Sequence, residues 1–290
     1  MILPKFHYLR PKSLDEVLAL LSRGEKGARL LAGGTDILVK MKQGLINPDC
    51  LISLRDIPEL NFIRYDKMRG LRIGSMTSLT TIMESLLIKR YAPALCEAMR
   101  SMSSVQIRNL ATIGGNLCNA SPANDSAPIL IAMGARVRIV GAKGKRTAPL
   151  EDFFTGPGAT VLKPDEVLTE IHIPNQPPET GGAYLKYGLR KASAIAVVGA
   201  AAVVTLEDGR CKDVRVALGA VAPTPIRARR AEAVLRGEGL EEELINRVAE
   251  LSAEEARPIT DVRGAEWYRR ELVRVLIKRA IRRAAERCIS

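Results

Sequence analysis

Two glycine pairs have the residue types and surroundings needed to bind a phosphate group. Gly33-Gly34 lies in the segment LLAGGTD at residues 30–36, and Gly114-Gly115 lies in ATIGGNLCNASPAND at residues 111–125. Because glycine has no Cβ, the backbone N–H groups around it can form a concave nest for an anion. A single glycine pair is more often only a turn. Two pairs on separate segments, each after an apolar run, could hold one diphosphate from both sides.

Other familiar patterns for catalysis or nucleotide binding are missing from the sequence. The tripeptide at residues 156–158 lacks the third glycine of G-x-G-x-x-G, and Lys145 is followed by Arg146 where a phosphate-binding loop needs serine or threonine. His7 and His172 are the only histidines, which leaves no braced Ser–His or Cys–His pair and no plausible zinc site. The five cysteines form no C-x-x-C pair, so neither a disulfide framework nor an iron–sulfur site is encoded.

With their flanking residues, AGGTD and TIGGN…NASPANDSAP resemble the FAD-binding (medium) subunit of molybdenum hydroxylases. This family includes the medium subunit of aerobic carbon monoxide dehydrogenase and the flavin domain of xanthine dehydrogenase. The resemblance covers nearly the whole chain, because the carboxy-terminal third is similar to the closing domain of that family. It implies an α+β fold, with a two-part FAD-binding α/β domain of the vanillyl-alcohol-oxidase/p-cresol-methylhydroxylase type. A C-terminal three-stranded antiparallel sheet covered by helices would follow.

By this resemblance, two segments bind the FAD diphosphate between the first two sub-domains. The residues implied are Leu31, Ala32, Gly33, Gly34, Thr35, Asp36, Ile37, Leu38, Thr112, Ile113, Gly114, Gly115 and Asn116. The hydroxyl groups of Thr35 and Thr112 can add donors to the backbone nests. We expect Asn116 to brace its own loop. No histidine or cysteine stands at an obvious tethering position, so we expect noncovalent FAD.

Five further residues match family positions around the flavin. Asp125 matches an acid that accepts hydrogen bonds from FAD hydroxyls, or else it is the N-cap of the next helix, and its two oxygens allow both roles. Lys186 matches a lysine at the flavin's polar edge, where a cation would stabilise negative charge on a reduced flavin, unless it is only a solvated strand residue. Met102 and Leu168 occupy positions beside the ring, although a core role suits them as well. Ile195 replaces the aromatic residue of many relatives, so we expect packing on the ring without stacking.

The elements that must position these residues follow from capping and apolar patterns. Ser13 with Glu16 forms a capping box that opens a helix through about residue 21. A strand at 28–32, a helix at 37–43 ended by Gly44, and a strand at 50–54 form a β-α-β unit with the first glycine pair at its strand-to-helix junction. We assign residues 1–55 to this N-terminal FAD-binding sub-domain.

A second FAD-binding α/β sub-domain is predicted for residues 56–176. Its expected strands are 62–65, 71–76, 136–140 and 167–173, and its expected helices are 78–87, 92–102 and one that starts at residues 125–128. The second glycine pair is expected in a loop. Residues 175–182, rich in proline and glycine, are the best linker candidate. The C-terminal domain at 177–290 then has strands at 183–190, 196–207 and 211–221, with Asp208-Gly209 as a type I′ hairpin turn, and helices at 224–236, 240–256 and 264–287.

The net charge of +12 invites a nucleic-acid hypothesis, but aromatic residues make up only 4% of the chain and do not interleave with the basic ones. The basic residues near the C-terminus share an amphipathic helix with apolar positions 273, 276/277, 280/281, 284 and 288, so we expect a solvated or partner-facing basic side. No apolar stretch is long enough to span a membrane, and the first residues lack the apolar core of a secretory signal. We therefore expect a cytoplasmic location and no nucleic-acid partner.

The resemblance implies a function as the flavin-carrying component of a heteromeric molybdenum hydroxylase. Electrons would come from the [2Fe-2S] clusters of a small partner subunit, pass through FAD, and leave to an external acceptor. A large partner subunit would carry molybdopterin, and the complex would be a dimer of heterotrimers. Two alternatives remain open: a stand-alone FAD oxidoreductase, for which the sequence shows no catalytic acid or base, and a redox-inactive assembly subunit with the same fold.

Overall fold

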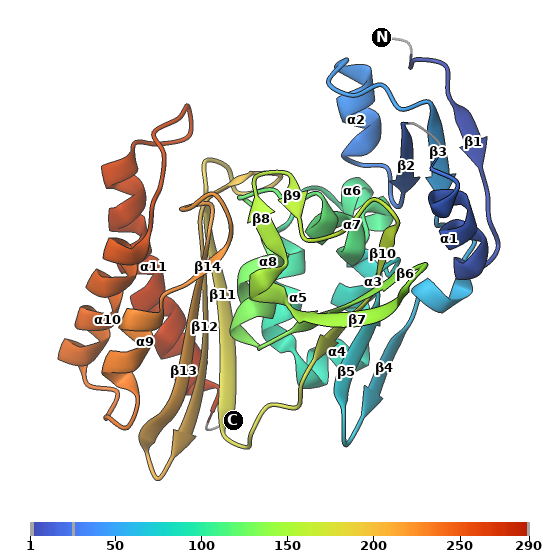
Figure 1. Ribbon diagram of the computed structural model, residues 1–290. Coiled ribbons are helices and arrows are strands. Elements are labelled where there is room, and N and C mark those ends of the chain that lie inside the picture. Colours follow the sequence, from blue (N-terminus) through green and yellow to red (C-terminus); the bar gives the residue numbers. More distant parts are fainter. Residues whose placement is uncertain (1–2, 25–26, 289–290) are drawn as a thin grey trace.

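The described chain has four β-sheets: three larger ones that follow one another along the chain, each beside a hydrophobic core, and a two-stranded one within the second unit. The structure is a computed structural model that describes residues 3–24 and 27–288. Figure 1 shows the N-terminal unit on one side, the C-terminal unit on the other, and the second unit between them. Each of these sheets lies within one of the three predicted segments, and the exact divisions at residues 55 and 176 stay predictions.

The N-terminal sheet is parallel, with strand order β1-β3-β2. Its elements are β1 (His7–Leu9), α1 (Leu14–Ser22), β2 (Ala28–Leu31), α2 (Ile37–Lys42) and β3 (Cys50–Ser53). The predicted β-α-β unit is confirmed. Strand β1 was not predicted, because three mostly exposed residues leave no pattern to detect. The cap of α1 is also confirmed, since Ser13 Oγ accepts from the N–H of Glu16 at 3.2 Å, while the Glu16 carboxylate accepts from the N–H of Lys12.

The second unit combines a five-stranded antiparallel sheet, ordered β4-β5-β10-β6-β7, with six short helices. The strands are β4 (Ile63–Asp66), β5 (Gly70–Gly74), β6 (Arg136–Gly141), β7 (Gly144–Pro149) and β10 (Glu166–Ile173). The helices are α3 (Leu79–Glu84), α4 (Leu86–Tyr91), α5 (Pro93–Ser101), α6 (Val105–Leu110), α7 (Ile113–Cys118) and α8 (Ser126–Ala132). The helix predicted at 78–87 is broken at Ser85, because its backbone is extended and its side chain caps α4. A small hairpin of β8 (Phe154–Gly156) and β9 (Ala159–Thr160) precedes β10.

The C-terminal unit has one strand more than the three predicted. Its strands are β11 (Thr180–Gly188), β12 (Ala196–Glu207), β13 (Arg210–Gly219) and the short β14 (Ile226–Arg227). Its helices are α9 (Arg229–Leu235), α10 (Glu242–Glu255) and α11 (Glu266–Glu286). The predicted hairpin turn is confirmed by positive φ angles of 52° at Asp208 and 76° at Gly209.

This sheet lies between two layers of helices, as Figure 1 shows. Helices α9, α10 and α11 form the outer layer, and α5 and α8 of the second unit cover the other face. Both faces of β12 are therefore buried, which explains why residues 196–206 read as a continuous apolar run and not as an alternating one. The apolar residues expected on the inner side of α11 are buried as predicted. No helix in the described ranges is long and apolar enough to cross a membrane.

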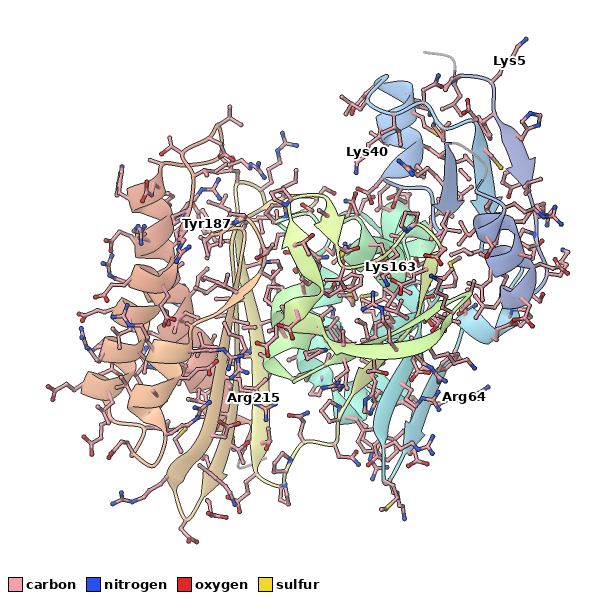
Figure 2. All side chains as sticks on the ribbon, in the orientation of Figure 1. Lys5, Lys40, Arg64, Lys163, Tyr187 and Arg215 are labelled. Atoms are coloured by element: carbon pink, nitrogen blue, oxygen red, sulfur yellow. The ribbon has the colours of Figure 1, made fainter. Side chains whose placement is uncertain are left out.

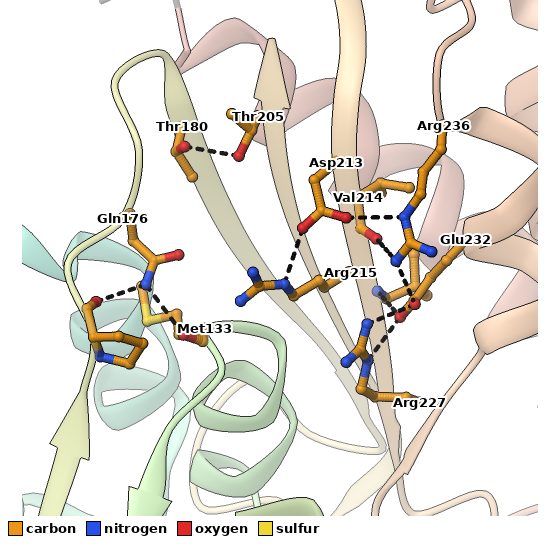
Figure 3. A network of polar contacts seen from close by, with 12 residues as sticks. Met133, Gln176, Thr180, Thr205, Asp213, Val214, Arg215, Arg227, Glu232 and Arg236 are labelled. Atoms are coloured by element: carbon orange, nitrogen blue, oxygen red, sulfur yellow. Dashed lines mark hydrogen bonds and ion pairs between the residues drawn. The ribbon is translucent and has the colours of Figure 1, made fainter. Parts of the chain in front are cut away.

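Polar contacts hold the edges of this unit in place (Figure 3). Glu232, buried at 1% exposure, accepts two hydrogen bonds from Arg227 and one from the N–H of Val216, which fixes α9 on β13. Gln176 donates to the carbonyls of Met133 and Pro174, so the connection from β10 to β11 is tied to the end of α8.

Glu166, at the start of β10, gives a pH test of how the second sheet is held. Its carboxylate accepts two hydrogen bonds from Arg146 of β7 and one from the N–H of Lys163, and these contacts lower its pKa to about 2. A lowered pKa in the folded chain means that the stabilisation is complete above the ordinary pKa and disappears as the pH falls towards the lowered one. Glu166→Gln should therefore cost about 1–3 kcal/mol at pH 7 and progressively less below about pH 4.

The measurement is denaturant unfolding of both proteins at pH 7, 5 and 3. Glu250→Gln is the matched control, because the bond from Arg247 to Glu250 lies on the exposed surface of α10 and contributes little. A stability difference between wild type and Glu166→Gln that stays constant from pH 7 to pH 3 would contradict the lowered pKa.

Candidate functional site

A cavity of about 660 Å³ lies between the N-terminal unit and the second unit. Its walls come from the segment after β2, the first turns of α2, the end of β5, the connection between α5 and α6, α7 and β10. In Figure 1 the end of α2 at which the helix begins lies over α6 and α7. The first and second glycine pairs therefore meet at one cavity, although about eighty residues separate them in the chain.

The first glycine pair presents unused hydrogen-bond donors to this cavity. Across the described ranges, the backbone N–H groups of residues 33–37 have no hydrogen-bond partner. Gly34 has a φ of +78°, a left-handed conformation that glycine adopts without strain. Successive N–H groups that are exposed on a bent segment before a helix are suited to an anion such as a diphosphate.

The second glycine pair is not the second nest that the sequence predicted. Gly114 and Gly115 lie in the first turn of α7, not in a loop, because Thr112 caps the helix and its Oγ1 accepts from the N–H of Gly115 at 3.1 Å. The N–H of Gly114 donates to the carbonyl of Ser75 at 2.8 Å, and the N–H groups of residues 113 and 116 are bonded as well. This pair lines the cavity but uses its own donors to hold α7 in place.

The lack of a Cβ at these glycines serves chain packing first. A Cβ on Gly33 would lie 2.0 Å from the carbonyl oxygen of Leu110, and a Cβ on Gly114 would lie 2.6 Å from the Cβ of Ser75. Both positions bring two backbones closer than any other residue allows. For Gly33 and Gly114 the expectation that the glycine leaves room for the ligand itself is therefore corrected, since the neighbouring segment fills the space that they leave.

Ser75 carries a buried polar atom that lacks a partner. Its Oγ is inaccessible and forms no hydrogen bond with any residue the structure describes, and Ser75 lines the cavity at the end of β5. A buried hydroxyl without a partner costs about 1–3 kcal/mol. The hydroxyl can bond a polar ligand in the cavity only if the Ser75 side chain rotates towards it, and such a bond would remove this cost.

Most of the predicted site residues lie on the cavity. These are Ala32, Gly33, Gly34, Thr35, Asp36, Ile37, Met102, Thr112, Gly114, Gly115, Asn116 and Leu168. Leu31, Leu38, Ile113, Asp125, Lys186 and Ile195 are not among the described residues that line it. Asn116 braces its segment as predicted, because its Oδ1 accepts from Ser126 Oγ at 2.7 Å and its carbonyl accepts from Asn124. Ile195 is 60% exposed in the connection that follows β11.

Asp125 and Lys186 are paired with each other at the junction of the second and C-terminal units. Lys186 Nζ lies 2.7 Å from one carboxylate oxygen of Asp125, and the hydroxyl of Tyr184 donates to the other at 2.7 Å. The lysine also donates to the carbonyl of Ser101, next to the cavity-lining Met102. Burial raises the pKa of Asp125, and the contacts with Lys186 and Tyr184 oppose that rise. The predicted contacts of Asp125 and Lys186 with the flavin stay predictions.

Asp125 occupies the N-cap position of α8, as the alternative predicted, but its side chain makes no capping hydrogen bond to the helix. Asn124 takes that role, because its Oδ1 accepts from the N–H groups of Ser126 and Ala127 at 2.8 and 3.1 Å.

Several cavity residues were missed by the sequence analysis. They include Arg29, Lys40, Ser75, Ser103, Ile107, Cys118, Asn119 and Gly158. Two of them left a signal: Lys40 lies one helical turn after Asp36, and Asn119 follows the second glycine pair within the same helix and its cap. The others come from segments that only the folded chain brings together.

Comparison with known proteins agrees with this site and fold. The family model described as the FAD binding domain in molybdopterin dehydrogenase matches residues 4–176. The model described as the CO dehydrogenase flavoprotein C-terminal domain matches residues 183–284. The gap between the two matches, residues 177–182, covers the end of the connection from β10 and the first residues of β11.

Individual relatives match over almost the whole length. The xanthine dehydrogenase FAD-binding subunit of Escherichia coli O157:H7 is 35% identical over 278 residues, which cover 96% of this chain and 95% of the relative. The carbon monoxide dehydrogenase medium chain of Hydrogenophaga pseudoflava is 35% identical over 288 residues, which cover 99% of this chain and 100% of the relative. A solved structure of carbon monoxide dehydrogenase from H. pseudoflava superimposes with a TM-score of 0.96 at 36% identity, covering 99% of this chain and 100% of that chain.

These matches show that the chain is a flavoprotein component of molybdenum-dependent dehydrogenases, and its α+β fold agrees with them. The chain belongs to the family of medium, FAD-binding subunits of heteromeric molybdenum hydroxylases, to which the carbon monoxide dehydrogenase medium chain and the xanthine dehydrogenase FAD-binding subunit also belong.

The unpartnered hydroxyl of Ser75 leads to a prediction with two opposite effects. Ser75→Ala removes a buried polar atom that no described residue bonds, so the thermal stability of the protein prepared without FAD should stay equal or rise. The same change removes a hydroxyl that could rotate to bond FAD in the cavity, so FAD should bind about three- to tenfold more weakly. Differential scanning fluorimetry and flavin fluorescence titration measure the two effects.

Ser252→Ala is the matched control. The Ser252 hydroxyl is equally buried but donates to the carbonyl of Val248 inside α10, so its loss should lower the stability and leave FAD binding unchanged. If Ser75→Ala behaved as this control does, the hydroxyl would not be part of the binding site.

Proposed function

We propose that this chain binds one FAD noncovalently in the cavity between its N-terminal and second units. The observation that carries this proposal is the row of unpartnered N–H groups at residues 33–37 of the described chain, on the same cavity that Ser75 lines. The diphosphate would accept hydrogen bonds from the N–H row. Two predicted site residues, Met102 and Leu168, would line the path of the flavin ring with apolar surface.

The protein supplies binding, orientation and electrostatics, while redox chemistry belongs to the cofactor. Bound FAD would supply electron transfer between the [2Fe-2S] clusters of a small partner subunit and an external acceptor. The residues on the apolar walls would exclude water from the ring. Asp125 and Lys186, at the junction with the C-terminal unit, would place a charged pair behind Met102.

The names of the relatives support a place in a larger complex, because both a medium chain and an FAD-binding subunit imply partners. We propose a small iron–sulfur subunit and a large molybdopterin subunit, assembled as a dimer of heterotrimers in the cytoplasm. The basic side of α11 was the predicted docking surface. Much of its charge is already paired, since Arg270, Arg274, Arg282 and Arg283 each contact a glutamate of this chain.

The first test concerns the cofactor. The purified chain should be yellow with one FAD per chain, and precipitation with acid should release that flavin into the supernatant. The reason is that the cavity holds its ligand through N–H groups and apolar contacts. Flavin that stays with the precipitated protein would show a covalent bond and contradict the proposal. A protein with no visible flavin absorption, even after incubation with FAD, would favour the redox-inactive assembly subunit.

The second test concerns the partners. When the chain is coexpressed with the products of its neighbouring genes, it should elute from size-exclusion chromatography together with an iron–sulfur protein and a molybdopterin protein. By itself it should oxidise no organic substrate of the complex, yet its flavin should become reduced when the substrate is added to the recombined subunits. If the chain elutes alone and turns over a substrate unaided, it is a stand-alone oxidoreductase and not a subunit.

A further inference from the structure

One side-chain amide joins the two units across the edge of the cavity. Asn119, the residue that ends α7, accepts a hydrogen bond from Lys40 Nζ at 2.8 Å through its Oδ1. Its Nδ2 donates to Asp36 Oδ1 at 2.9 Å. All three residues line the cavity. Figure 2 labels Lys40 on α2, in the N-terminal unit.

Both partners of this amide lie on the same helix. Asp36 is the N-cap position of α2 and Lys40 follows four residues later, so their side chains share one face of the helix. The Asn119 amide thus contacts α2 at two points one turn apart. These two contacts fix the rotation of α2 about its own axis as well as the distance of α2 from α7. The unpartnered N–H groups of residues 33–37 in the described chain lead directly into this helix, so the same two contacts also fix where those donors point.

The bridge requires a side chain that can both accept and donate hydrogen bonds. Asp36 offers only acceptors when ionised and Lys40 offers only donors, so the residue between them must accept on one side and donate on the other. An amide does both. A carboxylate at position 119 would still accept from Lys40 but would face Asp36 with a second negative oxygen. Lys40 keeps two further ammonium protons with no partner in the described part of the chain, and these can reach a ligand in the cavity.

We propose that Asn119 is the positioning residue for the anion-binding end of the site. It holds α2, its preceding N–H row and the Lys40 ammonium against the second unit, so that these donors converge on the diphosphate of the bound cofactor. This inference rests on the proposed binding of FAD in the cavity. A contact between two units of the chain would then determine where the donors for the diphosphate lie.

The test is a double-mutant cycle between positions 36 and 119, with FAD affinity as the readout. Asn119→Asp should weaken FAD binding by about tenfold or more, because the donor to Asp36 is replaced by a like charge. In the background of Asp36→Asn, the same change should cost much less, because the amide then at position 36 can donate to the new carboxylate at position 119 while Lys40 pairs with it. The affinity of each variant comes from titrating the FAD-free protein with FAD and following flavin fluorescence.

A control separates this effect from simple repulsion of the diphosphate by an added negative charge. Gln43→Glu adds the same charge at the end of α2 but lies off the bridge, and it should change the affinity by less than about threefold. The protection of α2 amides from hydrogen exchange gives a second readout, which should fall in Asn119→Asp and recover in the double variant.

Three results decide the outcome. If the cost of Asn119→Asp is the same with aspartate and with asparagine at position 36, the bridge does not position the site and the inference is overturned. The same follows if Asn119→Asp binds FAD as tightly as the wild type does. A wild-type chain that binds no FAD at all would instead overturn the proposed function, which keeps the two failures apart.

Discussion

The close approach of two backbones at Gly33 is the contact on which the site depends. Position 33 follows β2 and begins the row of donors at 33–37, and it lies against the carbonyl of Leu110 at the end of α6. Any side chain there would force the two units apart, because its Cβ would lie only 2.0 Å from that carbonyl oxygen. The walls that the two units contribute to the cavity would then separate. The site is therefore a property of the junction, and neither unit contains it alone.

A second junction links the site to the C-terminal unit. Tyr184 and Lys186 of β11 place their polar groups on Asp125, and this buried cluster replaces water around three polar side chains. Removing the Asp125 carboxylate would leave the buried Tyr184 hydroxyl without a partner and Lys186 with only the carbonyl of Ser101, which is more costly than never having buried these groups. Lys186 also donates to the carbonyl of Ser101, and the next residue, Met102, lines the cavity. The position of the C-terminal sheet is therefore coupled to the cavity wall.

Local patterns predicted the parts of this architecture that local physics determines. The capped helix after Ser13, the turn at Asp208-Gly209 and the buried stripe of α11 each depend on residues close in sequence, and each is confirmed. Strand β7 pairs with the neighbouring β6 in a tight hairpin, but its exposed and half-buried residues show no apolar pattern that would predict a strand. The bridge through Asn119 joins residues about eighty positions apart, so no window of the sequence contains it. The fold class could be predicted because the resemblance spans the whole chain, whereas the contacts at the junctions could not.

The two glycine pairs show where sequence reasoning reaches its limit. Both have the same composition and both were expected to form nests, yet within the described chain the donors of one are free and those of the other are bonded to Ser75 and Thr112. The difference arises because the second pair lies in the first turn of α7, where its N–H groups bond to Ser75 and to the capping Thr112. The chain before α2 turns through Gly34 without such partners. A glycine pair can thus offer its N–H groups to a ligand only if no acceptor of a neighbouring segment already bonds them. In this chain the N–H groups of the second pair hold α7 in place. The side-chain amide of Asn119, at the C-cap of α7, contacts the helix that follows the donors of the first pair.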